Sequence, residues 1–229
     1  MYIAGLSLPF SATQSVEGLV SLATAQFFYN AFKTMANLKV LADAEGGAVR
    51  PQTVPTSFLA KIVSPIHGLA FFVPPLAFIV GVACNDFYQP KWMLDLSLPN
   101  DLISSHSKVA VRVAACLAGL SYAKVMESGF KHLGDQWHVI GRREKPRVVQ
   151  SGPYAIIRHP MYSSVLVQEA LFALMFWSNA PLYGLVITAA AFAIKMPIEE
   201  NIIERDEIVA QEYRDYKKKV PYRIIPYLW

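Results

Sequence analysis

The sequence has little charge for its length. Of its 229 residues only 17% are charged and 54% are hydrophobic, whereas soluble domains carry about 25% charged residues. The net charge of +4 is small, and the basic residues are spread over loops and the C-terminal region, which argues against a nucleic-acid-binding surface. This composition predicts a small integral membrane protein, with the basic excess serving its orientation in the bilayer.

Cysteine is also scarce. Cys84 and Cys116 are the two cysteines, both lie in apolar runs and they form no CxxC pair. A disulfide framework and a zinc site are therefore not supported, and we expect both to be packing residues. His132 and His138 lack metal-ligand spacing and are expected in loops, and His67 is expected to pack inside a helix, so no metal is predicted. The N-terminus also lacks the basic region of a cleavable signal, so targeting is expected from the first spanning segment.

Long apolar runs dominate the rest of the sequence. Because a helix needs roughly 20 apolar residues to cross a bilayer, we predict an all-α polytopic membrane protein with about five transmembrane helices. The candidate windows are about 16–36, 62–84, 109–126, 161–178 and 180–196. The first window carries Gln26, Asn30 and Lys33, so an interfacial helix remains an alternative there. In the second, Pro74 and Pro75 are expected to kink the helix.

The loop charges predict the orientation, because cytoplasmic loops are enriched in Lys and Arg. The loop after the first window is basic, the loop after the second is acidic, and the loop at 127–160 is strongly basic. The turn at 178–181 carries no charge. This alternation favours five passes, with the 127–160 loop and the C-terminus on the cytoplasmic side and the N-terminus opposite.

The segment after the fifth window is amphipathic. Its apolar residues recur at helical spacing and are Ile198, Ile202, Val209, Tyr213, Tyr216 and Val220. We therefore predict a C-terminal amphipathic cytoplasmic helix over 198–219. The lysines at 217–219 suit the negative end of its dipole and anionic lipid headgroups.

Two clusters could carry chemistry. In the first, Arg158 and His159 precede Pro160, which suits the first position of a helix. The bend would place these side chains at a helix N-terminus, which favours an anion. The alternative is a capped membrane entry, with Arg158 at the headgroups.

The second cluster lies at the end of the fifth window, where Lys195 precedes the pair Glu199 and Glu200. Charges at the bilayer centre cost about 2.5–3.5 kcal/mol each, so these groups should lie at the membrane boundary or line a polar cavity. Lys195 and Glu200 are offset by roughly 140° on a straight helix, and Pro197 could supply a bend between them. The short turn at 178–181 predicts an antiparallel hairpin that brings the two clusters together.

Glu169 lies inside the fourth window, where an ionisable residue is by default a functional candidate. It could line an acceptor tunnel. It could instead pair with Gln26 or Asn30.

Several motifs occur in a specific order: Gly152-Pro-Tyr, Arg158-His-Pro-Met-Tyr, Glu199-Glu and Glu212-Tyr-Arg-Asp-Tyr. As an ordered set over residues 130–226 they resemble the isoprenylcysteine carboxyl methyltransferase family and related membrane phospholipid methyltransferases. The resemblance implies methyl transfer from S-adenosyl-L-methionine, an endoplasmic reticulum location and an active site facing the cytoplasm. It also implies one domain, with variable N-terminal helices at 1–126 and a cofactor-binding catalytic core at 127–229.

Matching positions extend the resemblance to individual residues. The implied cofactor contacts are Arg147, Val148, Val149, Tyr154, His159, Pro160, Met161, Tyr162 and Glu200. Lys195 and Glu200 would be catalytic, and Lys195 would contact the acceptor. Lys195 stands in place of a family arginine, which keeps the charge but loses the two-pronged carboxylate grip. Pro146 replaces a family histidine after an apparent insertion at 141–147.

The resemblance leaves the acceptor open. A prenylated or other lipid-like carboxylate is favoured, since it is ionised at neutral pH and needs no general base. An amine acceptor, as in phospholipid N-methylation, would need one, and Glu200 or Glu169 are the candidates. A sterol reductase using NADPH is a lesser alternative, because those enzymes usually have Asn where this chain has Met161. A non-enzymatic scaffold would leave the bend and the acidic pair without a role.

Overall fold

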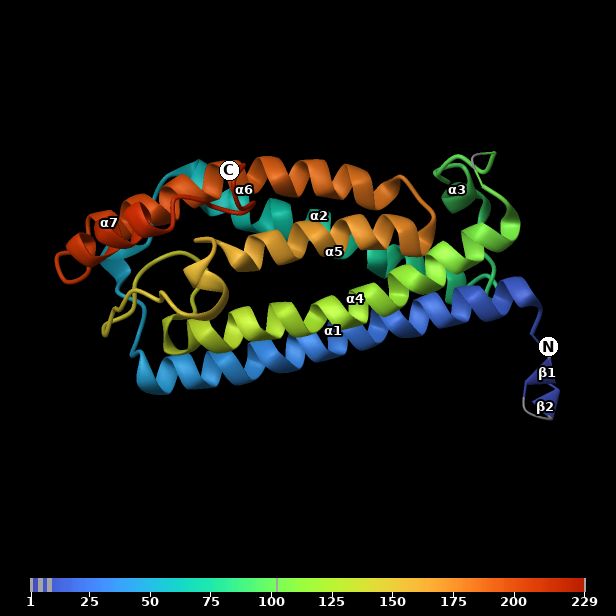
Figure 1. The fold of residues 1–229 in the computed structure, drawn as a ribbon, viewed down its shortest axis with the longest axis horizontal. Coiled ribbons are helices and arrows are strands. Elements are labelled where there is room, and N and C mark those ends of the chain that lie inside the picture. Colours follow the sequence, from blue (N-terminus) through green and yellow to red (C-terminus); the bar gives the residue numbers. More distant parts are fainter. Residues whose placement is uncertain (1, 4–5, 8–9, 102, 229) are drawn as a thin grey trace.

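The computed structural model describes residues 2–3, 6–7, 10–101 and 103–228. Five long helices lie lengthwise beside one another in an elongated bundle (Figure 1). They are α1 (Ala12–Glu45), α2 (Phe58–Ala83), α4 (Ser105–Leu133), α5 (Pro160–Phe176) and α6 (Ala180–Glu204). The shorter elements are β1 (Tyr2–Ile3) paired antiparallel with β2 (Leu6–Ser7), η1 (Pro51–Thr53), α3 (Lys91–Leu94), η2 (Gly134–Gln136), η3 (Gly152–Ala155) and α7 (Ala210–Lys219).

Each of the five predicted windows falls on one of the long helices, which confirms the predicted helical fold. Among the described residues, three helices are long and apolar enough to cross a membrane: α2, α4 with its extension to Gln136, and α6. α5 is a shorter apolar helix. α1 is long but carries polar residues throughout, so a count of five spans stays a prediction.

The helix starts follow the local sequence. Serines cap three of them: Ser11 forms a capping box with Gln14 at α1, and Ser57 and Ser104 accept a backbone N–H at α2 and α4. Such caps satisfy amide groups that have no partner inside the helix. The local sequence therefore sets where these helices begin.

The predicted hairpin of α5 and α6 is confirmed. α5 ends at Phe176, the left-handed backbone of Trp177 (φ 54°) reverses the chain, and α6 starts at Ala180. The end of α6 thus returns to the level at which α5 begins (Figure 1). α6 continues as one helix through Pro197, so the proline does not end it.

The C-terminal prediction was wrong in its extent. Instead of one helix over 198–219, α6 continues to Glu204, the chain turns, and α7 begins at Ala210. The turn places the Asp206 carboxylate, whose side chain is fully buried, against Arg50 and Arg142, and this ion pairing replaces helix continuity. The apolar face was correctly predicted beyond the turn, since its buried residues are Val209, Tyr213, Tyr216 and Val220.

The core lies between α1, α2, α4 and α5. It is rich in phenylalanine: Phe27 of α1 contacts Phe71 of α2 and Phe172 of α5 edge to face, and Phe78 stacks on Phe176 with ring centroids 4.2 Å apart. Cys116 packs in this core as predicted, whereas Cys84 is exposed at the end of α2 and is not a packing residue. The four helices are thereby held in register along their length.

A buried ion pair lies in the half of the bundle that contains the N-terminus. Arg112 of α4 donates from Nη1 and Nη2 to the two oxygens of Glu17 on α1, at 2.7 and 2.6 Å. Its Nε donates to the Met175 carbonyl at 2.8 Å, and Gln89 also donates to Glu17. Every charged atom of this pair therefore has a partner.

Candidate active site

The Arg-His-Pro bend is the first part of the site. His159 has a non-helical backbone (φ −123°, ψ 59°), and α5 begins at Pro160, as predicted. The backbone N–H groups of Arg158 and His159 donate to the carbonyls of Tyr222 and Arg223, at 3.0 and 2.8 Å. The segment after α7 thus holds the bend in place.

Glu200 lies behind the bend at the centre of a charged cluster. Arg158 donates from Nε to Oε1 at 2.8 Å, and Arg223 donates from Nη2 to Oε2 at 3.0 Å. His159 Nε2 lies 3.1 Å from Oε1, and Lys217 Nζ lies 3.6 Å from Oε2. Because the carboxylate is only 2% exposed, these cations compensate a charge that would otherwise be costly to bury.

Arg158 is structural rather than a headgroup ligand. It is 9% exposed, and its Nη1 donates to the carbonyls of Val220 and Pro221 at 2.7 and 2.6 Å. The alternative that placed Arg158 at the lipid headgroups is therefore wrong. The guanidinium joins the bend, α6 and the end of α7.

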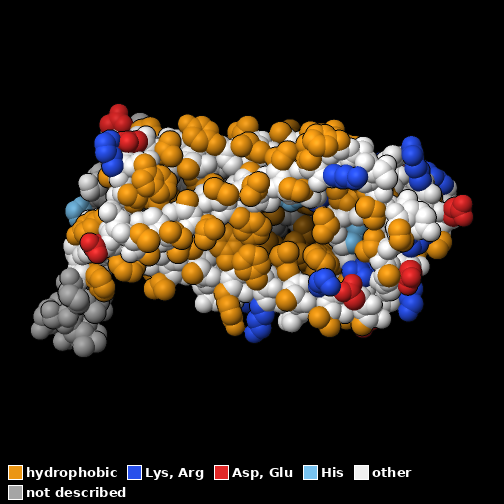
Figure 2. Space-filling model, turned by 180° about the vertical axis from the view of Figure 1, so that it is seen from behind, with side chains coloured by type: hydrophobic (Ala, Val, Ile, Leu, Met, Phe, Trp, Pro, Cys, Tyr) orange, Lys and Arg blue, Asp and Glu red, His pale blue; other side chains and the backbone are white. Residues whose placement is uncertain are grey.

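A cavity of about 460 Å³ opens in front of the bend. Its polar end is formed by the 134–159 loop and the starts and ends of helices: Gln136, His138, Arg142, Arg147, His159, Tyr162, Lys195 and Glu199. Its apolar walls come from α1, α2 and α4, and include Phe27, Phe28, Phe32, Phe71, Phe72, Met126 and Phe130. The surface is hollowed here, and mostly hydrophobic side chains surround the opening (Figure 2).

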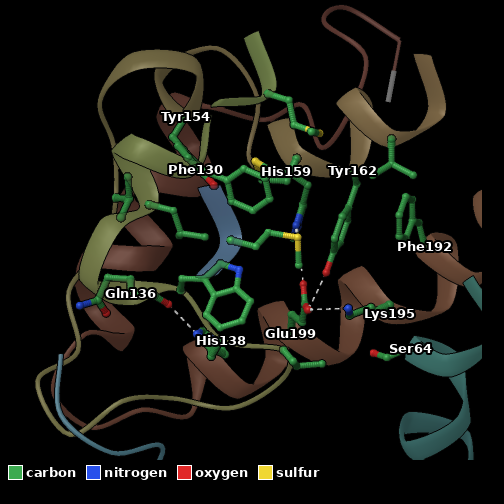
Figure 3. Close-up of a pocket in the computed structure, with 18 of the residues that line it drawn as sticks. Ser64, Phe130, Gln136, His138, Tyr154, His159, Tyr162, Phe192, Lys195 and Glu199 are labelled. Atoms are coloured by element: carbon green, nitrogen blue, oxygen red, sulfur yellow. Dashed lines mark hydrogen bonds and ion pairs between the residues drawn. The ribbon is translucent and has the colours of Figure 1, made fainter. Parts of the chain in front are cut away.

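Three side chains project into the cavity as one polar group (Figure 3). The Tyr162 hydroxyl donates to Glu199 Oε1 at 2.6 Å, and Lys195 Nζ lies 3.7 Å from the same oxygen. The Lys195 ammonium also lies over the Tyr162 ring, 5.3 Å from its centroid. On its two sides the Tyr162 ring stacks with His159 and Phe192, at 5.3 and 4.1 Å. The tyrosine is thus fixed in orientation.

The structure brings most of the predicted site residues together. Those that line the cavity are Arg147, Val148, Val149, Tyr154, His159, Met161, Tyr162 and Lys195. Pro160 and Glu200 are buried but are not among the lining residues. Pro160 sets the start of α5, and Glu200 supports the wall from behind.

Glu169 is not among the lining residues either. Thr188 of α6 donates to its Oε1 at 2.9 Å, so it joins α5 to α6. The alternative pairing with Gln26 or Asn30 was also wrong, since Gln26 donates to Asn30.

The sequence indicated the pair Glu199 and Glu200, and the catalytic role was assigned to Glu200. The structure turns Glu199, not Glu200, toward the cavity. Lys195 and Glu199 are four residues apart, a spacing that places side chains on one helix face. The spacing alone could therefore have favoured Glu199.

His138 was expected to be an ordinary loop residue and instead lines the cavity. Its Nδ1 lies 2.6 Å from the Gln136 carbonyl, so this nitrogen carries the proton. Burial lowers the pKa of His138 to about 4, which the Gln136 carbonyl only partly opposes. The ring is neutral at pH 7 and offers Nε2 as an acceptor.

The apparent insertion at 141–147 docks onto the loop after α1. Arg143 donates from Nη1 to the carbonyls of Ala42 and Gly47, at 2.9 and 2.6 Å, and from Nε to the Trp137 carbonyl at 2.7 Å. Backbone bonds pair Arg50 with Arg142 and Glu144 with Ala48. The residues that follow, which were predicted to contact the cofactor, are thereby anchored to the N-terminal helices. No sequence signal indicated this contact.

Comparisons with known proteins agree with this placement. No curated protein matches the chain. Residues 114–205 match the model of the isoprenylcysteine carboxyl methyltransferase family. The matched segment contains most of α4, the bend, α5 and α6, while α1, α2 and α7 lie outside it. The match confirms the resemblance to the isoprenylcysteine carboxyl methyltransferase family and supports a membrane methyltransferase.

Proposed function

We propose that the protein transfers a methyl group from S-adenosyl-L-methionine to the carboxylate of a prenylated or other lipid-like acceptor. One observation carries the proposal: a single cavity joins the buried polar group of Tyr162, Lys195 and Glu199 to phenylalanine walls from α1 and α2. A donor with charged groups and an acceptor with an apolar chain could meet there. The family match supports the same class of reaction.

The residues at the polar end suit the cofactor. When bound, S-adenosyl-L-methionine supplies a methyl group on a sulfonium cation, for which the Glu199 carboxylate is a suitable neighbour. Arg147, Val148, Val149, Tyr154, His159 and Met161 would form the rest of its wall. The cavity volume of about 460 Å³ falls within the usual range for small-molecule sites, roughly 300–1,000 Å³.

Lys195 would bind the acceptor carboxylate. The residue is only 4% exposed, and its Nζ lies 3.7 Å from a Glu199 oxygen. A carboxylate acceptor is ionised at neutral pH, so no residue has to remove a proton. Lys195 and the phenylalanine walls would act by orienting the acceptor and excluding water.

Glu200 would act indirectly. It fixes Arg158 and His159, and these residues position Tyr162 and the start of α5. In this scheme Glu200 is a positioning residue, whereas His159 and Tyr162 contact the cofactor.

The membrane placement follows the charge pattern. We propose five passes, with the 127–229 core and the open polar end facing the cytoplasm from the endoplasmic reticulum membrane. The helices of 1–126 would supply the acceptor wall, because α1 and α2 contribute much of the apolar lining.

Binding of S-adenosylhomocysteine to the purified protein tests the cofactor assignment. Isothermal titration should give saturable binding that Glu200→Ala abolishes, because the bend loses its central carboxylate. Glu207→Ala, at an exposed position in the turn after α6, is the control and should bind like the wild type. Absence of binding to the wild type, or normal binding to Glu200→Ala, would overturn the assignment.

An amine acceptor is the second candidate because Glu199 faces the cavity and could accept a proton. The two reactions respond differently to acid. N-methylation should lose rate steeply as the amine becomes protonated, whereas esterification should continue toward the pKa of the carboxylate. Mass spectrometry of products from a total lipid extract and a methyl-labelled donor would identify the acceptor.

A further inference from the structure

We propose that Ser64 of α2 supplies a second contact to the acceptor carboxylate, beside Lys195 of α6. The inference rests on the proposed function and assigns a role to a helix outside the family match. The paired contacts from Ser64 and Lys195 would make the site selective for an ionised carboxylate over a neutral polar group.

The packing of α2 against α6 places the two side chains together. The helices run antiparallel (Figure 1), and the His67 and Phe192 rings lie 5.0 Å apart across their interface. The backbones also approach closely near Gly184, where an added Cβ would lie 2.7 Å from the Ala70 carbonyl oxygen. One turn from His67 toward the start of α2 is Ser64, and one turn from Phe192 toward the end of α6 is Lys195. Both steps lead to the same end of the cavity.

Both groups have unused donors. Ser64 Oγ is buried and has no hydrogen-bond partner among the described residues. Lys195 Nζ is within 4 Å of one carboxylate, but at 3.7 Å it lies beyond hydrogen-bond distance. Both residues line the cavity, and Figure 3 shows Ser64 of α2 and Lys195 of α6 on the same side of it. Buried polar groups are normally hydrogen-bonded, so a ligand atom is the expected partner.

Two donors on separate helices suit the two oxygens of a carboxylate. A lysine provides a point charge rather than the rigid fork of an arginine, and the Ser64 hydroxyl would complete a two-point contact. During transfer, one carboxylate oxygen forms a bond to the methyl carbon while the sulfonium–methyl bond breaks and leaves its electron pair on sulfur. The ester is neutral and loses its attraction to Lys195, which favours product release.

The test measures binding in the presence of saturating S-adenosylhomocysteine, so that no reaction occurs. The probes are N-acetyl-S-farnesylcysteine and its carboxamide, which has the same chain without the charge. Ser64→Ala should bind the acid about tenfold more weakly, as expected for one hydrogen bond to a charged group. Its affinity for the carboxamide should be unchanged.

A matched control exists in the same fold. Ser21 of α1 also has a buried hydroxyl without a partner among the described residues, but it is not among the lining residues. Ser21→Ala should bind both probes like the wild type.

The outcomes separate the two proposals. Equal affinity of Ser64→Ala and wild type for the acid would overturn the role of Ser64. Equal affinity of the wild type for acid and carboxamide would overturn the carboxylate site even though the nucleoside binds. Failure of S-adenosylhomocysteine to bind the wild type would overturn the proposed function itself.

Discussion

Two of the buried charge clusters lie in opposite halves of the bundle, one around Glu17 and Arg112 and the other around Glu200. Around Glu17 and Arg112, each charged atom has a partner at hydrogen-bond distance. Around Glu200, one carboxylate faces Arg158, Arg223, His159 and Lys217, and a cavity with the Lys195 ammonium lies in front of it. Burial of charge is common to both, so burial does not identify a site.

The two clusters differ in the hydrogen-bond donors that remain without a partner in the described part of the chain. The Glu17 cluster joins α1 to α4, and each nitrogen and oxygen of its two charged groups has a partner, which is the pattern of a structural ion pair. The Glu200 cluster fixes one wall, while Lys195 and Ser64 in the adjacent cavity retain donors. In this protein the candidate site therefore differs from a structural ion pair in having, next to a cavity, hydrogen-bond donors without a partner among the described residues.

Replacement of Glu200 should have the largest effect. Glu200→Ala leaves Arg158 and Arg223 without their buried counter-charge, which should cost about 3–5 kcal/mol of stability and abolish methyl transfer. Thermal unfolding in detergent and S-adenosylhomocysteine titration would measure both. A stable variant that binds the nucleoside normally would contradict the assigned role.

Replacements in the Glu17–Arg112 cluster should lower the stability of the fold without changing nucleoside binding. Arg112→Met should destabilise the fold by about 3–5 kcal/mol, because Glu17 is left buried and unpaired. The double variant Glu17→Leu with Arg112→Met should recover most of that loss. Both should retain nucleoside affinity wherever they are folded. A specific loss of affinity in the folded double variant would erase the distinction between the two clusters.

Lys195 should separate acceptor binding from cofactor binding. Lys195→Met should lower kcat/KM for a prenylated carboxylate by about 100-fold, in the range of losing a charge-assisted contact in a buried site. Nucleoside affinity should change little, and Lys195→Arg should restore most activity, since the charge returns. Initial rates at varied acceptor concentration provide the measurement. A uniform loss of nucleoside binding in Lys195→Met would assign the lysine to the cofactor instead.

His138 should give the smallest effect, seen as a pH dependence. Burial lowers its pKa from 6.5 to about 4, so between these values the unfolded chain binds more protons than the folded protein. The free energy of unfolding therefore falls as the pH drops through this window, by about 1–2 kcal/mol at pH 5. His138→Gln should reduce the pH-dependent change in Tm between pH 7.5 and 5. An unchanged dependence would show that the ring is not held neutral.

The sequence predicted the parts that depend on local pattern. Apolar runs located the long helices, the turn at 178–181 gave the α5–α6 hairpin, and Pro160 gave the start of α5. Ordered motifs also located most of the cavity wall. These features depend on nearby residues and were readable for that reason.

The features that were missed depend on contacts between distant segments. The break before α7 follows from Asp206 meeting Arg50 and Arg142, some 156 and 64 residues away by numbering. The place of His138 in the cavity follows from the way its loop docks on the helices. A single sequence carries little signal for such contacts.

The docking of residues 142–145 onto 46–50 has a consequence for any attempt to exchange parts between relatives. Arg143 donates to the backbone carbonyls of Ala42 and Gly47 and to the Asp43 carboxylate, so the attachment depends on the end of α1 and on the length and shape of the loop that follows it. A chimera that imports a foreign α1 and α2 should therefore keep the native linker between them. With that linker retained, the acceptor wall could be replaced while the cofactor wall keeps its anchor.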